Sequence, residues 1–429
     1  MDLKSKKIFW NILGGSFAKG MNILIALILT PPLLNYLGNT QFGIFSTIYS
    51  FYIINNILDL GLGMYLQNKI PELSHSSDKT LLHRAISTVF FALLGIALLS
   101  LILFLSLENH INWAFIFKTN SDAFTASKSI KIFVYCWALY LPFSMVQKIR
   151  IGYQNAYKSD LWVSIGNVLG MIFCFVFIHE ERSLPYFILA IFGSSTFVNF
   201  IHFFSFFHQN SNLIPNSKLL DNQLFKHFFK ESFIYFTLQT SALILISSDS
   251  ILIAHYMGVS HVTTYTLLYR IFGLCILPVS LIVSPIFYSL NEAFAQNDMA
   301  WVRKNSRKTL FFLIPVSLII YLLLILTSDS VVSFWLKKEI HFPLEMLLSF
   351  GWLVVVFNLN MFVANVSNTT SYFKKSFKIY PLACLITLIA KIIMVQIWGI
   401  SGVVLAYGVF IPLFYFIPFF RIFIRDNIL

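Results

Sequence analysis

Five charged side chains lie inside long apolar segments of this 429-residue sequence: Lys19, Asp59, Asp249, Arg270 and Lys391. An ionised group is costly in hydrocarbon, so it is retained there where it is paired, faces a polar cavity or reaches the membrane surface. Basic groups can bind anions such as phosphate, and carboxylates can bind protons or cations. These five residues are therefore the first candidates for a functional site.

More than one interpretation remains open for these residues. Lys19 lies about 16 Å from the start of its segment, so it faces a polar cavity, pairs with Asp59, or reaches the cytoplasmic surface along a kinked helix. Asp249 and Arg270 lie at matching depths, about 10 Å from one end of adjacent segments, which favours a salt bridge between them or an anion site that Asp249 controls. Lys391 is closer to a segment end, where its long side chain could reach the surface. Asp59 is either a helix-end carboxylate in a tight turn or a proton or sodium site.

The segments that carry these charges are long enough to cross a membrane. The chain is 58% hydrophobic and 11% charged, with a mean hydropathy of +0.77, whereas soluble domains carry about 25% charged residues. Residues 20–58 contain no charged side chain and no histidine. Hydropathy predicts an all-α polytopic membrane protein with about twelve spans. They are 9–34, 41–66, 84–107, 129–149, 161–178, 185–207, 232–255, 263–290, 309–327, 347–369, 379–397 and 403–424.

The first two spans also predict where the chain turns. Pro31 and Pro32 are expected to end the first helix, because proline lacks an amide donor and clashes with the preceding turn. Residues 36–38 (Tyr-Leu-Gly) are then expected to form the turn into the second span.

Charge and cysteine patterns exclude several other classes of protein. The net charge of +12 comes from basic loops on one side of the predicted spans, so both termini are expected in the cytoplasm and nucleic acid is not an expected partner. No glycine-rich nucleotide loop and no metal-ligand spacing occurs in the sequence, so no cofactor or metal is expected. The four cysteines all lie in apolar segments, where they are expected to be packing residues.

The two halves of the chain share short motifs at nearly one offset. Residues 36–38 (Tyr-Leu-Gly) match 256–258 (Tyr-Met-Gly), Phe45 matches Tyr265, and Tyr49 matches Tyr269. Residues 88–91 match 309–312 in the third span of each half. We expect six-helix lobes at 1–207 and 232–429, joined by a cytoplasmic linker at 208–231. An even number of spans per half gives both lobes the same orientation, with a substrate path between them.

Several of these motifs resemble the Wzx-type O-antigen flippases of the multidrug/oligosaccharidyl-lipid/polysaccharide exporter superfamily. The similar residues are Asn11 with Gly15 and Ser16, 32–38 (Pro-Leu-Leu-Asn-Tyr-Leu-Gly) with Phe42 and Gly43, 58–63 (Leu-Asp-Leu-Gly-Leu-Gly), 112–117, 331–336, and Asp249 with Gly258. The resemblance implies a V-shaped, two-lobed fold in a bacterial inner membrane. It implies a transporter, and not an enzyme, that moves undecaprenyl-pyrophosphate-linked oligosaccharide between leaflets by ion-coupled alternating access. It also implies roles in O-antigen and lipopolysaccharide biosynthesis, and as partners membrane lipid, an O-antigen polymerase and a chain-length regulator.

Such a cargo needs cations for its pyrophosphate and polar groups for its sugars. On that basis Lys19, Arg270 and Lys391 are the expected pyrophosphate ligands, and Asp59 and Asp249 are the expected ion-coupling or gating groups. Polar residues within the spans are suited either to sugar contacts or to hydrogen bonds between helices. They include Asn11, Asn56, Gln239 and Asn360.

Two other functions remain as alternatives. A multidrug or organic-cation antiporter of the same superfamily would need a lobe lined with carboxylates, whereas the charges within these spans are three basic and two acidic. A membrane enzyme such as a polysaccharide polymerase would need a large exterior loop with catalytic groups. The two largest exterior loops, 108–129 and 328–344, offer no convincing set.

Overall fold

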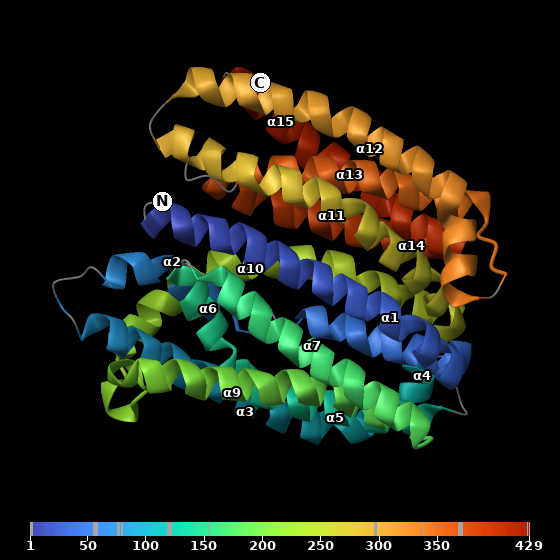
Figure 1. Ribbon diagram of the computed structural model, residues 1–429, viewed down its shortest axis with the longest axis horizontal. Helices are drawn as coiled ribbons and strands as arrows, with labels where there is room; N and C mark the ends of the chain where they lie inside the picture. Colours follow the sequence, from blue (N-terminus) through green and yellow to red (C-terminus); the bar gives the residue numbers. More distant parts are fainter. Residues whose placement is uncertain are drawn as a thin grey trace. The chain divides into compact units, whose positions relative to one another are not determined.

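The computed structural model describes residues 3–54, 59–74, 78, 80–117, 122–153, 155–295, 298–337, 339–367, 372–426 and 428. Across these residues every regular element is a helix, and no strand occurs (Figure 1). The chain divides into two compact units, residues 1–240 and 241–429, and each is described separately below.

In the first unit, α1 packs along α7, α7 packs on α9, and α3 packs on α5 (Figure 1). Short helices at the ends of these long ones complete the unit. Its elements are α1 (Leu3–Ile54), α2 (Leu62–Ser74), α3 (Leu81–Leu107), η1 (Glu108–His110), α4 (Trp113–Phe117), α5 (Ala123–Phe143), α6 (Met145–Gly152), α7 (Ala156–His179), α8 (Leu184–Ile188), the π-helical η2 (Leu189–Gly193), α9 (Ser194–Gln209), η3 (Ser211–Leu213), η4 (Ser217–Leu219) and most of α10 (Asn222–Met257).

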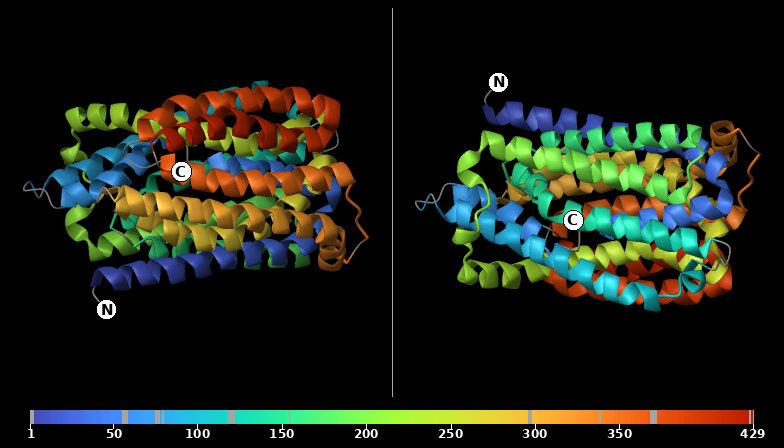
Figure 2. Two further views of the ribbon diagram at one scale, coloured as in Figure 1. Left: turned by 90° about the horizontal axis from the view of Figure 1, so that it is seen from above. Right: turned by 90° about the horizontal axis from the view of Figure 1, so that it is seen from below.

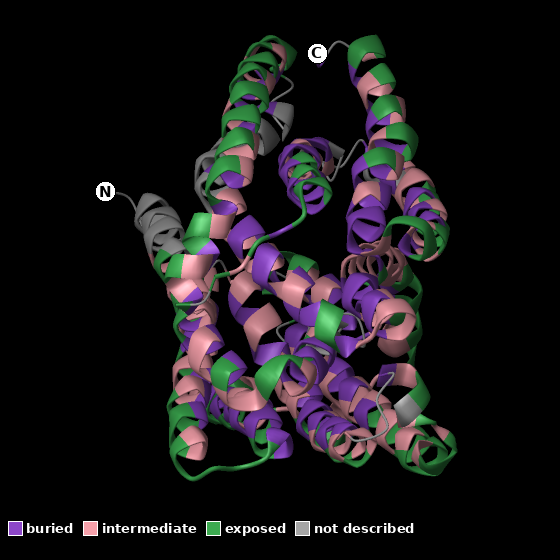
Figure 3. Cartoon of the chain, turned by 90° about the vertical axis from the view of Figure 1, so that its right-hand side faces the viewer, coloured by how far each residue is buried: buried purple, intermediate pink, exposed green. Residues whose placement is uncertain are grey.

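The second unit begins in the last part of α10. There α11, α12 and α13 pack against one another, and α14 packs on α13. Within each unit the long helices run side by side along one direction (Figure 2), and buried residues lie on the faces turned toward neighbouring helices (Figure 3). The remaining elements are α11 (Val259–Ala295), α12 (Met299–Leu336), α13 (Leu344–Ser367), α14 (Phe373–Ile411), the π-helical η5 (Pro412–Phe416) and α15 (Ile417–Arg425).

The prediction of a multi-pass helical membrane protein is confirmed. Each of the twelve predicted spans lies mainly on helices in the described part of the chain, and residues 59–61 of the second span form a turn. Among the described residues, nine helical segments are long and apolar enough to cross a membrane. Phe17–Ser50 overlaps the first two predicted spans, and Lys375–Arg425 contains the last two. In both, the spans are separated by a glycine with positive φ, Gly38 at 70° and Gly399 at 56°.

The prediction that Pro31 and Pro32 end the first helix is wrong. Both prolines lie inside α1, and the helical geometry breaks only at Gly38. In a membrane, neighbouring side chains can satisfy the carbonyls that proline leaves without a partner. The predicted turn at residues 36–38 is confirmed by the backbone of Gly38.

The motifs that match between the two halves have the same local geometry. Gly38 and Gly258 have φ angles of 70° and 101°, a backbone conformation that favours glycine. A Cβ atom on either glycine would meet nothing within 4 Å, so backbone conformation alone accounts for the residue type. Tyr49 stacks on Phe45 with an interplanar angle of 26°, and Tyr269 stacks on Tyr265 at 25°.

The predicted linker, residues 208–231, is ordered, and its second half is helical. The segment before α10 is attached to α3 by two hydrogen bonds: Asn216 N donates to Ser87 Oγ (3.1 Å), and Asp221 N donates to Thr88 Oγ1 (3.2 Å). Asp221 also forms an ion pair with Arg84. From Asn222 the chain continues as one helix into the predicted seventh span, because its amphipathic pattern merges with the apolar span that follows.

Candidate functional site

The second unit holds a buried ion pair between two membrane helices. Asp249 on α10 and Lys391 on α14 form a salt bridge, and Lys391 also donates a hydrogen bond to the backbone carbonyl of Leu245. Lys391 is fully buried and Asp249 is 7% exposed. Each charge is compensated locally, which is the condition under which a buried ion pair is tolerated.

Aromatic and amide groups surround this pair. The Tyr265 hydroxyl on α11 donates to Asp249 Oδ2 at 2.9 Å. The Lys391 ammonium lies over the Tyr407 ring, 5.7 Å from its centroid. Asn360 on α13 donates through Nδ2 to the Tyr407 hydroxyl at 3.2 Å. Four helices therefore contribute to one continuous polar network.

A small cavity of about 20 Å³ adjoins the pair. That volume holds roughly one water molecule. Apart from Asp249 and Lys391, its walls are apolar and aromatic, so the ion pair is its main polar feature. The other lining residues are Leu245, Ile246, Tyr269, Phe272, Leu353, Phe357, Val404 and Tyr407.

This geometry corrects two of the predictions. The predicted salt bridge between Asp249 and Arg270 is wrong, because the ion-pair partner of Asp249 is Lys391. Arg270 is half-buried on α11. The alternative in which Lys391 reaches the membrane surface is also wrong, because its side chain is completely enclosed.

Sequence reasoning also missed two tyrosines of the network. Tyr265 was noted only as part of a repeat, and Tyr407 was not singled out. The sequence offered one signal for Tyr265, because it lies 16 residues after Asp249 in the next predicted span. It gave no comparable signal for Tyr407.

The first unit places Lys19 and Asp59 apart from each other. Lys19 is an exposed residue on α1, and its ammonium interacts electrostatically with Asp160 on α7. Asp59 interacts instead with Lys148 on α6. The predicted alternative of a Lys19–Asp59 ion pair is therefore wrong.

Asp59 lies in a tight turn before α2. The backbone N–H of Gly61 donates to Asp59 Oδ1 at 2.8 Å, and that of Leu62 donates to the Asp59 carbonyl at 3.0 Å. A Cβ atom on Gly61 would lie 2.5 Å from the Ser232 carbonyl oxygen, so α10 passes directly against the turn. The Lys148 ammonium on α6 lies close enough to Asp59 to interact with its carboxylate electrostatically.

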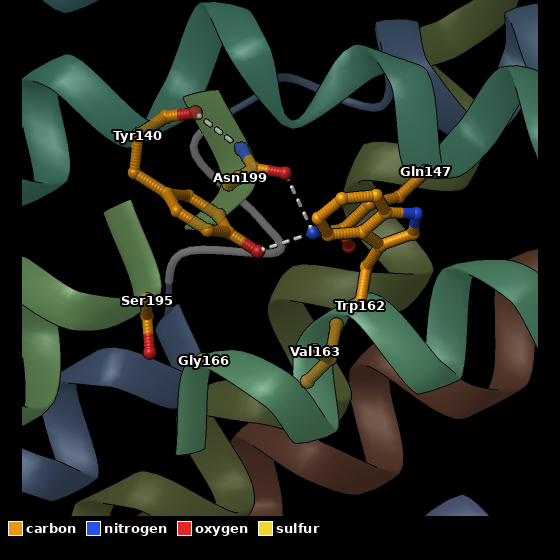
Figure 4. Close-up of a pocket in the computed structure, with 7 residues that line it drawn as sticks. All are labelled: Tyr140, Gln147, Trp162, Val163, Gly166, Ser195 and Asn199. Carbon is orange, nitrogen blue, oxygen red and sulfur yellow. Dashed lines mark hydrogen bonds between the residues drawn. The ribbon is translucent and has the colours of Figure 1, made fainter. Parts of the chain in front are cut away.

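A polar pocket lies among α5, α6, α7 and α9 of the first unit (Figure 4). The Gln147 side-chain amide donates to the Tyr140 hydroxyl at 2.8 Å and to Asn199 Oδ1 at 3.1 Å. Trp162 and Ser195 complete its polar lining, and its volume is about 10 Å³. The pocket therefore joins three amide and hydroxyl groups across the helices, and it has room for a single water molecule at most.

Of the four polar residues predicted for sugar contacts, two have side chains in the described part of the structure, one in each unit. Asn360 joins the Lys391 network in the second unit. Gln239 on α10 has its Oε1 atom buried, with no hydrogen-bond partner among the described residues. Asn11 lies on α1, but its side chain is outside the described part of the structure, as is the whole of Asn56.

Solved structures with this fold are transporters. The chain aligns with an inward-facing multidrug resistance MATE family transporter of the MOP superfamily at a TM-score of 0.80, with 14% identity over 95% of each chain. It aligns with the lipid II flippase MurJ in an inward closed conformation at a TM-score of 0.72, with 16% identity over 96% of this chain and 88% of the other. A MOP superfamily transporter from Pyrococcus furiosus, described as having a reversed polarity of its binding pocket, aligns at a TM-score of 0.70. The identity is 12% over 97% of this chain and 96% of the other.

The chain is a multi-pass membrane protein, and its fold is the one seen in these solved MOP-superfamily transporters. The family follows from the sequence, because a model of the polysaccharide biosynthesis protein family matches residues 5–291. The chain belongs to that family. No curated protein sequence matches it significantly.

Proposed function

We propose that this protein is a flippase for lipid-linked oligosaccharides. Its cargo would be an undecaprenyl-pyrophosphate-linked repeat unit of O-antigen or a similar polymer, moved from the inner to the outer leaflet of a bacterial cytoplasmic membrane. The observation that carries the proposal is membership of the polysaccharide biosynthesis family in a chain with an exporter fold. Alternating access would be ion-coupled, both termini would lie in the cytoplasm, and no bond would be broken.

The exposed Lys19 is the best-placed candidate for contact with the pyrophosphate. It is the one predicted cation that is exposed in this conformation, whereas Lys391 is enclosed and Arg270 is half-buried. A lysine ammonium acts on phosphate as a mobile point charge, and an arginine adds a forked contact. We therefore propose that Lys19 makes an early contact with the cargo and that Arg270 and Lys391 contribute in other conformations. Asp249 would control whether Lys391 is available to the cargo, because its carboxylate forms a salt bridge with the Lys391 ammonium.

The organic-cation antiporter is the second candidate, and the fold shared with a MATE transporter favours it. Such a protein needs an acidic group that is available to the cationic substrate. In the second unit Asp249 is already neutralised by a lysine of the same chain. This feature supports the lipid-linked cargo over the organic cation.

Deletion of the gene in its own host, with and without plasmid re-expression, would test the proposal. We expect loss of the surface polysaccharide, with lipid-linked repeat units accumulating on the cytoplasmic side, and recovery on re-expression. Lys19→Glu should fail to restore the polymer, while Lys158→Glu, at an exposed lysine of α7, should restore it. Arg270→Glu should also fail while remaining in the membrane. An intact polymer together with reduced export of organic cations would support the antiporter instead.

A further inference from the structure

The Lys391 ammonium occupies an enclosed site built from three kinds of group. It contacts a carboxylate oxygen of Asp249, the backbone carbonyl oxygen of Leu245 and the face of the Tyr407 ring. All three belong to the second unit, and Lys391 itself has no exposed surface. The ammonium is therefore enclosed, and a carboxylate, a carbonyl oxygen and an aromatic ring of the protein solvate it.

These groups are typical ligands of a dehydrated monovalent cation. Carboxylate and carbonyl oxygens replace the water shell of hard cations, and an aromatic face attracts a cation through its quadrupole. The Leu245 carbonyl also accepts a hydrogen bond from the Ser248 hydroxyl at 3.2 Å, which holds this oxygen as an acceptor inside α10. The site has the composition of a cation site, with the cation supplied by the chain's own lysine.

Charge and space both exclude a second cation from this site. The ammonium already neutralises Asp249, and the adjoining cavity of about 20 Å³ is lined otherwise by uncharged residues such as Phe272, Leu353 and Phe357. A volume of this size holds about one water molecule. Removal of the lysine side chain beyond Cβ would open the space and leave the carboxylate without its partner.

We propose that Lys391 is an internal cation that fills a monovalent-cation site in the second unit and thereby makes this unit independent of sodium and potassium ions. The site itself follows from the geometry alone. Its consequence, that no alkali metal ion couples transport through Asp249, rests on the flippase function proposed above. Loss of the ammonium converts the site into one that binds a sodium ion or a small ammonium ion.

The melting temperature of the purified full-length protein in detergent tests this proposal without any transport assay. Wild type, Lys391→Ala and Lys391→Met are compared in sodium, methylammonium and choline chloride at equal ionic strength. Lys391→Met is the matched control, because its side chain refills the space and carries no charge. At about ten times the dissociation constant, sodium or methylammonium should raise the melting temperature of Lys391→Ala over its value in choline by roughly 3 °C or more. Wild type and Lys391→Met should show no such difference.

Three results would overturn the proposal. The first is an equal response to sodium in wild type and Lys391→Ala. The second is a Lys391→Ala response that persists when Asp249→Asn is added, because the carboxylate would then not be a ligand. The third is a Lys391→Ala protein that fails to fold in every salt while Lys391→Met folds, because the open site would then bind no cation. Failure of the flippase proposal would appear only in the polysaccharide assay, so the two failures can be told apart.

Discussion

The Asp249–Lys391 pair predicts strong coupling in a double-mutant cycle. Removing one partner of a buried ion pair leaves an uncompensated charge and typically costs about 3–5 kcal/mol. Both residues are almost completely enclosed, and the single changes Asp249→Asn and Lys391→Met should each approach that cost. For a unit of this size, that corresponds to a fall in melting temperature of about 6–20 °C. The double variant replaces the pair with two neutral groups, and it should recover most of the loss.

Thermal unfolding can be followed with a thiol-reactive dye, because Cys136, Cys174 and Cys384 are buried in the folded protein and become reactive on unfolding. Ser248→Ala, one residue from Asp249 and outside the ion pair, serves as the control substitution and should cost about 1 kcal/mol. The reasoning is refuted if the losses of the two single variants simply add in the double variant. Additivity would mean that the two charges do not compensate each other in the membrane.

Three further predictions concern the first unit. Gly61→Ala should destabilise the protein by about 2–5 kcal/mol in thermal unfolding, because residue 61 has a φ of 76° and the new methyl group would meet the Ser232 carbonyl at 2.5 Å. The hydrogen bond from the Leu224 N–H lowers the pKa of Asp221 in the folded protein. The ionised Asp221 carboxylate therefore stabilises the fold above its ordinary pKa of about 3.9, and this stabilisation is lost as the pH falls below that value. The melting temperatures of wild type and Asp221→Ala should therefore converge as the pH falls from about 6 to about 3. If Asp59 is a proton site, the pH dependence of polysaccharide export should differ between wild type and Asp59→Asn.

Each of these predictions has a matched control. Gly20→Ala on α1 introduces a methyl group into open space and should change stability by less than about 1 kcal/mol. An equal effect at positions 20 and 61 would contradict the steric argument. A constant difference between wild type and Asp221→Ala at every pH would show that the carboxylate charge is irrelevant there. For Asp59, an unchanged pH dependence of polysaccharide export in Asp59→Asn relative to wild type would leave only its role in the turn.

Hydropathy predicted the helices well because a helix in lipid has to carry mostly apolar side chains, and such runs are visible in the sequence. The turn at Gly38 was predicted for the same kind of local reason, because the backbone there adopts a conformation that favours glycine. The prediction for Pro31 and Pro32 failed because the rule it used was derived for helices in water. In a membrane helix, neighbouring groups can satisfy the carbonyls that proline leaves without a donor, and α1 continues through both prolines.

The charged residues of the site could be identified from sequence, but their partners could not. Depth along a span follows from counting residues, whereas the direction in which a side chain points depends on the rotation of each helix against its neighbours. Matching depth favoured Arg270 as the partner of Asp249, and nothing in the sequence indicated Lys391. Only the packing of α10 against α14 decides between them, and it joins residues 142 positions apart.

That separation along the chain also affects how the protein is made. Asp249 leaves the ribosome 142 residues before Lys391. At synthesis rates of about 5–20 residues per second, the carboxylate waits roughly 7–28 s for its partner. During this interval α10 has to enter the bilayer with an acidic group that nothing yet neutralises, and α14 later brings a lysine that is just as costly to insert alone. Completion of the salt bridge is therefore a late step of membrane assembly, and the yield of folded protein should be lower for chains that lack either partner.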